Sequence, residues 1–256
     1  MNYTFLVIGE RCLDVFVYGE VKRLSPEAPI PVFSPVLRNK NDGMAKNVYN
    51  NLFSLISKGN DESQLFGIFS DEGMVKTRYV DQKSNHYFIR VDEGDTSLPI
   101  KFSKYNKSFI HQADCILISD YNKGFLSEVD IRAIASHKKE NAVIFLDSKK
   151  KLSKETINVI DYVKFNKEEA TLNEALCREF PQKIIITKGS EGAYHDGCSY
   201  TFQPKITMDV SGAGDTFLAA LAYYYMKDKN HFITNGIINA NTCASEVVSK
   251  RGVSVI

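Results

Sequence analysis

Short apolar runs rich in β-branched residues recur along the chain and alternate with longer segments whose apolar residues have helical spacing. The runs are Phe5–Ile8, Cys115–Ile118, Val143–Leu146 and Lys183–Thr187. The helical segments are Met44–Leu55, Ser127–Lys138, Lys167–Glu179 and Asp215–Lys227. Nearly continuous apolar strands are typical of a sheet buried on both faces, and their alternation with helices indicates parallel pairing. We predict an α/β fold with a doubly wound, mostly parallel sheet flanked by helices, and ligands at the carboxyl ends of its strands.

Two regions, at about 15–37 and 75–91, depart from this pattern. Alternation such as that of Tyr87–Val91 predicts exposed antiparallel strands, and the prolines of Ser25–Val32 favour a stiff, extended connection. We expect these regions to form a small sheet that serves as a lid, inserted in one domain that spans residues 1–256. The polar stretch Ser57–Gly73 is expected to be a surface loop, with Leu65–Phe69 as its one strand-like segment.

Composition narrows the function classes. Lys and Arg number 32 against 31 Asp and Glu, so a formal charge of +1 gives no general attraction to nucleic acid or to anionic membranes. No apolar run is long enough to span a bilayer, and the first residues do not resemble a signal peptide, so we expect a cytoplasmic protein. The five cysteines lack Cys-x-x-Cys spacing and are expected to be reduced.

The stretch Asp209–Phe217 carries the clearest chemical signal. Gly212, Ala213 and Gly214 have almost no side chain and precede an apolar helical segment, so their amides could hold a phosphate at a helix N-terminus. Asp215, in the first turn, would face the same point. A glycine turn followed by an acidic capping residue would explain the same letters, and the residues alone leave both interpretations open.

Three further motifs follow predicted strands or open predicted helices. They are Gly9–Asp14, Gly43–Val48 and Asn166–Glu169. Each has a structural interpretation, because Asp and Asn cap turns and helices, and Asn166 with Glu169 could simply form a capping box. The turn Thr187–Gly192 could bind a nucleotide or connect a β-hairpin.

Taken together, these motifs resemble those of the ribokinase-like, or PfkB, sugar kinases, whose signature D-T-x-G-A-G-D matches residues 209–215 with Val210 in place of Thr. The order of Gly9–Asp14, Ser25–Val32 and Gly43–Val48 resembles one branch in particular, the bacterial heptose 7-phosphate kinases. Further similarity covers nearly the whole chain and includes 75–78, 89–92, 117–124 and 250–255.

The resemblance implies transfer of the γ-phosphoryl of ATP to a sugar hydroxyl, in this branch the anomeric hydroxyl of D-glycero-D-manno-heptose 7-phosphate. Asp215 would be the catalytic base, and the amides of Gly212, Ala213 and Gly214 would hold the transferring phosphoryl. Asn166 and Glu169 would organise Mg²⁺ through water. The candidates for contact with ATP, in addition to Gly212 and Gly214, are Lys188, Gly189, Asn166 and Asn241.

For the sugar, the resemblance implies Asp14 and Asn47 as hydroxyl ligands, with Gly43 allowing close approach of the backbone. Lys123, Arg78 and Arg90 are basic residues that could meet a distal phosphate, although an arginine in an exposed strand is more often simply solvated. The family further suggests a monovalent cation and a homodimer formed through the lid. The expected partners are therefore ATP and a small sugar phosphate.

The chain also departs from the family pattern. Met44 replaces a second glycine and Lys46 precedes Asn47, so the sugar pocket could be narrower or differently charged. Glu10 also replaces the usual Asp. Between Asn51 and Val75 the chain lacks room for a strand and helix that the family normally carries. Two alternatives therefore remain: a kinase for another sugar phosphate or a nucleoside, and a binding protein of the same fold that has lost catalysis.

Overall fold

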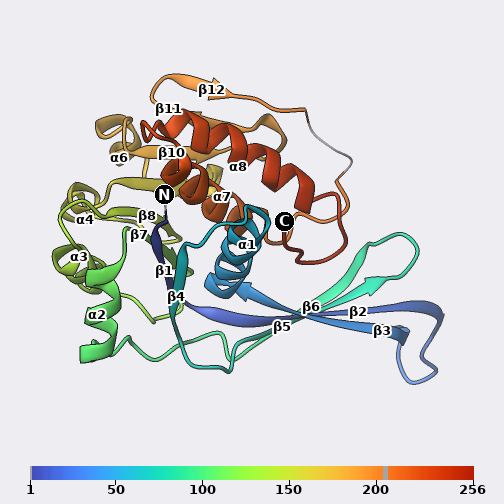
Figure 1. Cartoon of the computed structure of the whole chain (residues 1–256). Helices are drawn as coiled ribbons and strands as arrows, with labels where there is room; N and C mark the ends of the chain where they lie inside the picture. Colours follow the sequence, from blue (N-terminus) through green and yellow to red (C-terminus); the bar gives the residue numbers. More distant parts are fainter. Residues whose placement is uncertain (1, 204–206) are drawn as a thin grey trace.

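The computed structural model describes residues 2–203 and 207–256 (Figure 1). Its larger sheet contains β1 (Thr4–Gly9), β4 (Gln64–Phe69), β7 (Cys115–Asp120), β8 (Val143–Ser148), β9 (Tyr162–Phe165), β10 (Ile184–Thr187), β11 (Ala193–His195) and β12 (Cys198–Tyr200). Their order in the sheet is β12-β11-β10-β9-β8-β7-β1-β4. The strands from β10 to β4 pair in parallel, whereas β11 and β12 add an antiparallel edge. The predicted mostly parallel sheet is confirmed.

Helices cover both faces of this sheet, as predicted. They are α1 (Ala45–Lys58), α2 (Lys104–Gln112), α3 (Glu128–His137), α4 (Lys154–Val159), α5 (Lys167–Leu172), α6 (Glu174–Glu179), α7 (Ala213–Lys227) and α8 (Ile233–Val247). The single helix predicted over 167–179 is wrong, because Asn173 interrupts it. The Asn173 amide bonds to Leu152 N and Lys150 O, and its backbone leaves helical geometry at φ −113°. None of the helices in the described ranges has the length and apolar character needed to cross a bilayer.

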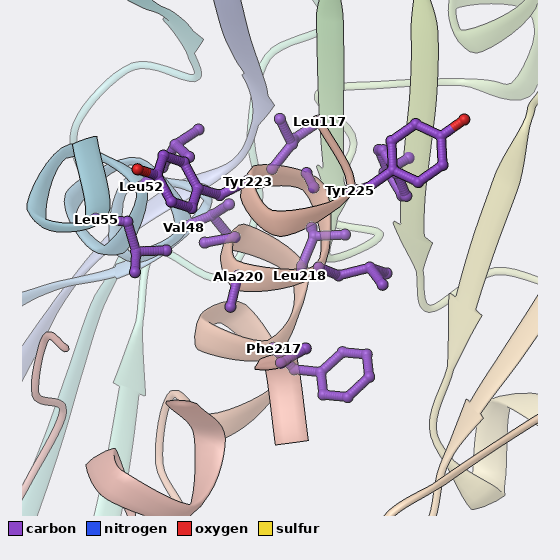
Figure 2. Packing of buried hydrophobic residues seen from close by; sticks show 14 of the residues in the cluster. Val48, Leu52, Leu55, Leu117, Phe217, Leu218, Ala220, Tyr223 and Tyr225 are labelled. Carbon is purple, nitrogen blue, oxygen red and sulfur yellow. The ribbon is translucent and has the colours of Figure 1, made fainter. Parts of the chain in front are cut away.

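Alternation along the buried strands divides the core into two layers. Phe5 and Val7 of β1 face α1, α7 and α8, whereas Leu6 and Ile8 face the opposite layer, which contains residues of α2, α3, α4 and α6. Figure 2 shows Val48 and Leu52 of α1 beside the apolar side chains of α7. Apolar residues on every side of α7 are therefore buried, and this packing fixes the position of its first turn.

Four strands form the separate small sheet, which extends from one end of the molecule in Figure 1. They are β2 (Arg11–Leu24), β3 (Pro31–Met44), β5 (Val75–Asp81) and β6 (Tyr87–Glu93), in the order β3-β2-β5-β6. The hairpins β2–β3 and β5–β6 are antiparallel, but β2 and β5 pair in parallel, so the prediction of purely antiparallel strands is wrong at the centre. The reason is that β1 and β4 are parallel neighbours, and each leads directly into its strand of the small sheet.

The interval between α1 and β5 is short, as its sequence suggested. The surface loop predicted over Ser57–Gly73 is wrong at its start and centre, because α1 continues to Lys58 and β4 occupies 64–69, whereas 59–63 and 70–73 lie outside helices and strands. The strand predicted at Leu65–Phe69 is confirmed. β4 is an edge strand, and the chain passes from it to β5 without a further helix or strand between them.

Candidate active site

Polar residues meet where the parallel strands of the large sheet end. Glu10 follows β1, Tyr121 follows β7, Asp147 lies near the end of β8, and Lys164 lies near the end of β9. The next two strands that the chain adds to the large sheet lie on opposite sides of β1, first β4 and then β7, which makes this edge a topological switch point. Ligands of open α/β sheets bind at such points.

Asp215 lies in the first turn of α7 and is buried, with 3% of its surface exposed. Its two carboxylate oxygens have different partners. Asn47 Nδ2 donates a hydrogen bond to Oδ2 at 3.0 Å, and the Tyr121 hydroxyl donates to Oδ1 at 2.7 Å. Residues from α1, from the loop after β7 and from α7 thus meet at one carboxylate.

Burial raises the pKa of Asp215 from 3.8 to about 6, against the opposing effect of the hydrogen bonds from Asn47 and Tyr121. Nearby Asp147 also raises this pKa, whereas Lys164 lowers it. The shift corresponds to an energetic preference for the neutral acid of about 3 kcal/mol relative to water. A carboxylate with this pKa remains ionised at neutral pH and is a stronger base than an exposed Asp.

A pH profile of any activity that uses Asp215 as a base should reveal this shift. The folded-state pKa is raised, so the protonated, inactive form accumulates below about pH 6, where an ordinary Asp would still be ionised. We expect log kcat/KM to fall with a slope of about one per pH unit below that point. A profile that stays flat down to pH 5 would contradict the assignment of Asp215 as the base.

The backbone that precedes Asp215 forms an open cradle. α7 has no side-chain cap at its N-terminus, and Gly212 takes the capping position with φ +83°. A Cβ at Gly212 would lie 2.7 Å from Asn47 Nδ2, so a larger residue would be strained and would displace this contact. Within the described residues, the amides of Gly214 and Asp215 have no backbone or side-chain acceptor, as is usual at helix N-termini, whereas the Ala213 amide donates to Val210 O at 3.3 Å. The amides of Gly214 and Asp215 are available to an anion.

Two cavities border the N-terminus of α7. The Asn241 cavity is lined by residues of the β10–β11 turn, α7 and α8, including Thr187, Gly189, Ala213, Gly214 and Asn241. The Asp215 cavity is lined by residues of the small sheet, the loop after β7 and the start of α7, including Asp14, Lys76, Tyr121, Gly212 and Asp215. Its volume of about 320 Å³ is within the range of small-molecule sites, about 300–1,000 Å³.

Among the residues predicted to contact a nucleotide, Gly189, Gly214 and Asn241 line the Asn241 cavity. Asn241 also donates to Tyr200 O at 2.8 Å, which fixes its amide. Lys188 is not among the lining residues, because its Nζ lies over the Tyr194 ring, 4.8 Å from the centroid. The sequence allowed the turn Thr187–Gly192 to bind a nucleotide or to connect a β-hairpin. In the structure it connects the antiparallel strands β10 and β11, and Gly189 within it lines the Asn241 cavity.

Asp14 and Arg78 form a buried ion pair on neighbouring strands of the small sheet, and both line the Asp215 cavity. Their side chains are only 7% and 9% exposed. Gly43 is placed against them, since a Cβ there would collide with Asp14 Oδ2. Gly43 was expected to let the backbone approach a sugar closely. In this structure the group that its missing side chain admits is the Asp14 carboxylate.

Arg90 and Lys123 also line the Asp215 cavity and are also paired. Arg90 makes two hydrogen bonds to Asp92, at 2.7 and 2.8 Å, and Lys123 pairs with Asp95. Each of the three basic residues selected from the sequence thus already has a carboxylate partner.

Two residues of this site were not selected as site residues from the sequence. Tyr121 binds Asp215, and Glu10 holds the loop that carries Tyr121. The buried Glu10 carboxylate accepts hydrogen bonds from Tyr121 N at 2.8 Å, Lys123 N at 3.0 Å and Phe125 N at 3.3 Å. The position of Glu10 after β1 was visible in the sequence, but nothing there indicated that its partners were three amides 111 to 115 residues away.

Asn166 and Glu169 form a complete capping box at the start of α5, which is the structural interpretation that the sequence allowed. Glu169 is buried, and Lys149 Nζ lies 3.3 Å from its Oε1. The Glu169 carboxylate accepts from Asn166 N, Asn166 Nδ2 and Lys149 Nζ, which leaves about one of its roughly four lone-pair positions for water. In the described part of the chain, no group of three or more His, Cys, Asp or Glu side chains could hold a metal ion.

A second buried ion pair lies beneath the cradle. Lys164 Nζ donates to Asp147 Oδ2 at 2.7 Å and would lie 3.2 Å from a Cβ at Gly214. Burial acts to lower the pKa of Lys164, but Asp147 and Glu169 outweigh it, so the pKa is raised. Lys164 therefore stays charged close to the helix N-terminus.

The departures at Met44, the last residue of β3, and at Lys46 of α1 have different outcomes. Met44 lines the Asp215 cavity, where it occupies space that a glycine would leave open. Lys46 is not among the residues that line the cavity, because its Nζ lies over the ring of Tyr49, 4.3 Å from the centroid. The effect of the Lys46 charge on the pocket stays a prediction.

Solved structures with the same architecture include Arabidopsis thaliana ribokinase complexed with ribose and ATP, with a TM-score of 0.70 and 16% identity over 98% of this chain and 94% of that chain. Another is Escherichia coli phosphofructokinase-2 in complex with potassium, with a TM-score of 0.71 and 13% identity over 99% and 94%. These similarities define a ribokinase-like α/β fold.

Sequence comparison identifies the family. A profile described as "pfkB family carbohydrate kinase" matches residues 74–255, and the chain belongs to that family. Similar curated proteins include the "Bifunctional protein HldE" of Helicobacter hepaticus, 27% identical over 98% of this chain and 61% of its own length. The same-named protein of Bradyrhizobium diazoefficiens is 28% identical over 99% and 61%. The chain thus spans about 61% of the length of these relatives.

Proposed function

We propose that this protein is an ATP-dependent sugar kinase whose acceptor is the anomeric hydroxyl of D-glycero-D-manno-heptose 7-phosphate, giving the 1,7-bisphosphate. The observation that carries the proposal is the position of Asp215. It lines one cavity at the N-terminus of α7, while Ala213 and Gly214 of the same turn line the other. A phosphoryl donor and an alcohol acceptor could therefore meet across a single helical turn.

ATP is proposed to occupy the Asn241 cavity, with its terminal phosphate at the amides of Gly212, Ala213 and Gly214. The positive end of the α7 dipole and the charge of Lys164 both favour a phosphate there. This cavity has a largely apolar lining that includes Phe217 and Val248, which suits a purine base. Gly189 and Asn241 are the proposed contacts for the nucleoside portion. Lys188 would have to move its side chain off the ring of Tyr194 to contact ATP.

The acceptor sugar is proposed to occupy the Asp215 cavity. The Asp215 carboxylate takes the proton of the sugar hydroxyl, the hydroxyl oxygen forms a bond to the γ-phosphorus, and the bond from that phosphorus to the bridging oxygen of ADP breaks. Asn47 and Tyr121 hold the carboxylate in place for this transfer. Asp14 and Asn47 are the proposed contacts for sugar hydroxyls, with Asp14 oriented by Arg78.

Mg²⁺ is proposed to accompany ATP, with Glu169 and Asn166 holding its water ligands. When bound, the ion would neutralise phosphate charge. The support is that Glu169 is close to Lys149, which lines the Asp215 cavity, and keeps about one lone-pair position for water. A monovalent cation stays a prediction; a similar solved structure is described as a complex with potassium.

The choice of heptose 7-phosphate is supported by the resemblance of the segment Ser25–Val32 and by the curated relatives. The test is a coupled ADP-release assay with Mg-ATP and a panel of heptose 7-phosphate, fructose phosphates, nucleosides and simple sugars. Preferred turnover of heptose 7-phosphate would support the proposal, and preference for another acceptor would replace the substrate. ATP binding without any sugar-dependent ADP release would favour a binding protein.

We also propose a homodimer formed through the small sheet. Large apolar side chains are exposed on its strands, including Val36 at 62%, Leu37 at 51% and Ile89 at 57%. An exposed apolar sheet surface is typical of an interface. Sedimentation should give twice the monomer mass of 28.9 kDa, and Ile89→Lys should shift the population to monomers. A monomeric wild type at all accessible concentrations would exclude this assembly.

A further inference from the structure

Lys76 differs from the other basic residues of the Asp215 cavity. Five basic side chains line this cavity, and four of them have a carboxylate partner: Arg78 with Asp14, Arg90 with Asp92, Lys123 with Asp95, and Lys149 with Glu169. In the described part of the chain, Lys76 makes no ion pair or hydrogen bond. It is nevertheless 92% buried, with 8% of its surface exposed.

The register of the small sheet makes this unusual. Lys76 on β5 lies between Asp14 on β2 and Asp92 on β6, so two carboxylates flank it across the strands. Both are engaged by arginines instead, Asp14 by Arg78 and Asp92 by Arg90. Lys76 and Arg78 are two residues apart on one strand, both are buried, and both line the cavity. The positive charge of Lys76 therefore faces the cavity without a compensating anion of its own.

An uncompensated buried ammonium group is costly. Burial lowers the pKa of Lys76, so the protein environment disfavours its charge in the absence of a ligand. The nearest aromatic contact is the ring of Tyr121, whose centroid lies 5.6 Å from Lys76 Nζ. This contact offsets part of the cost but supplies no hydrogen-bond acceptor. A ligand with negative charge would supply one.

The position of Lys76 also indicates which anion it could meet. The hydroxyl of Tyr121 binds Asp215, so Lys76 is one side chain away from the proposed base. It belongs to the small sheet, whereas the amides proposed for the transferring phosphoryl belong to α7. An acceptor whose reacting hydroxyl is at Asp215 could thus extend a second group towards Lys76.

We propose that Lys76 Nζ binds a phosphate monoester carried by the acceptor and so selects phosphorylated sugars over neutral ones. This inference rests on the proposed kinase function and deepens it. It assigns to Lys76 the role that the sequence suggested for Arg78, Arg90 or Lys123, because each of those residues already has an acidic partner. Lys76 is then a specificity residue and takes no part in proton transfer.

The test compares Lys76→Met with wild type, using each phosphorylated sugar that is turned over and its unphosphorylated counterpart. A hydrogen bond to a charged group contributes enough for roughly a ten- to hundredfold difference. Wild type should therefore prefer the phosphorylated sugar in kcat/KM by that factor, and Lys76→Met should remove most of the preference with KM for ATP unchanged. Lys76→Arg keeps the positive charge and should recover part of the preference for the phosphorylated sugar. The matched control is Lys83→Met in the exposed β5–β6 turn, which should behave as wild type.

The outcomes separate the two sources of phosphate. A raised KM for ATP, with the sugar preference intact, would show that Lys76 meets the nucleotide and would overturn the proposal. Equal use of phosphorylated and neutral sugars by wild type would also overturn it while leaving the kinase function in place. If no sugar supports turnover, the proposed function fails, and calorimetric titration with inorganic phosphate still tests Lys76. Binding by wild type that weakens at least about tenfold in Lys76→Met supports the proposal, and equal binding contradicts it.

Discussion

Replacing Asp215 by Asn is expected to lower kcat by roughly 10²–10⁴-fold, the range that a positioned general base contributes. The amide keeps the size of the side chain but cannot accept the proton of the acceptor hydroxyl. ATP affinity should stay within about threefold of wild type, because the lost group acts on the acceptor. Steady-state kinetics and calorimetric titration with ATP measure the two quantities separately.

The matched control for this substitution is Asp196→Asn, which changes an exposed carboxylate in the turn between β11 and β12. It should leave kcat unchanged. Wild-type turnover in Asp215→Asn would remove Asp215 as the base. A large loss of ATP affinity in that variant would indicate instead that its main effect is on the cradle at the start of α7.

Replacing Lys164 by Met is expected to lower the free energy of unfolding by about 3–5 kcal/mol, because it leaves the Asp147 carboxylate buried without its partner. Both side chains are largely buried, with 6% and 11% of their surfaces exposed. At about 2–4 °C per kcal/mol for a domain near this size, the melting temperature should fall by roughly 6–20 °C. Thermal and denaturant unfolding would measure the loss.

Two comparisons separate a buried charge from lost packing. The double variant Lys164→Met with Asp147→Asn removes both charges and should recover much of the stability. Lys154→Met breaks the exposed pair with Glu179 and should cost less than about 1 kcal/mol. If Lys164→Met were no less stable than Lys154→Met, the pair beneath the cradle would not contribute as described.

The sequence predicted most of the larger sheet, because most of its parallel strands are local apolar runs. β9, which carries the buried Lys164, was not among the predicted apolar runs. The runs at Phe5–Ile8 and Cys115–Ile118 identify strands without any knowledge of their neighbours. The break at Asn173 was missed, since it depends on hydrogen bonds to residues 150 and 152 that approach only in the folded chain. The parallel pairing of β2 with β5 was missed for a similar reason, because it follows from the order of β1 and β4 in the other sheet.

The position of Asp215 beside the glycine turn could be predicted because one contiguous motif encodes both at the start of one helix. The charges available to a ligand in the Asp215 cavity could not be predicted, because most of its basic side chains are paired with carboxylates that include residues on a neighbouring strand. Arg78 appeared available for a ligand until its pairing with Asp14 was known, and Lys76 was not among the basic residues selected from the sequence. Whether a basic residue is free or paired depends on register, which one sequence does not determine.

The central claim, that phosphoryl transfer occurs across the first turn of α7, is tested most directly by a crystal structure with Mg²⁺ and a non-hydrolysable ATP analogue. We predict the base of the analogue beside Asn241 and its terminal phosphate within hydrogen-bond distance of the amides of residues 212–214, facing the cavity that contains Asp215. A nucleotide bound elsewhere, or with its terminal phosphate turned away from Asp215, would contradict the claim.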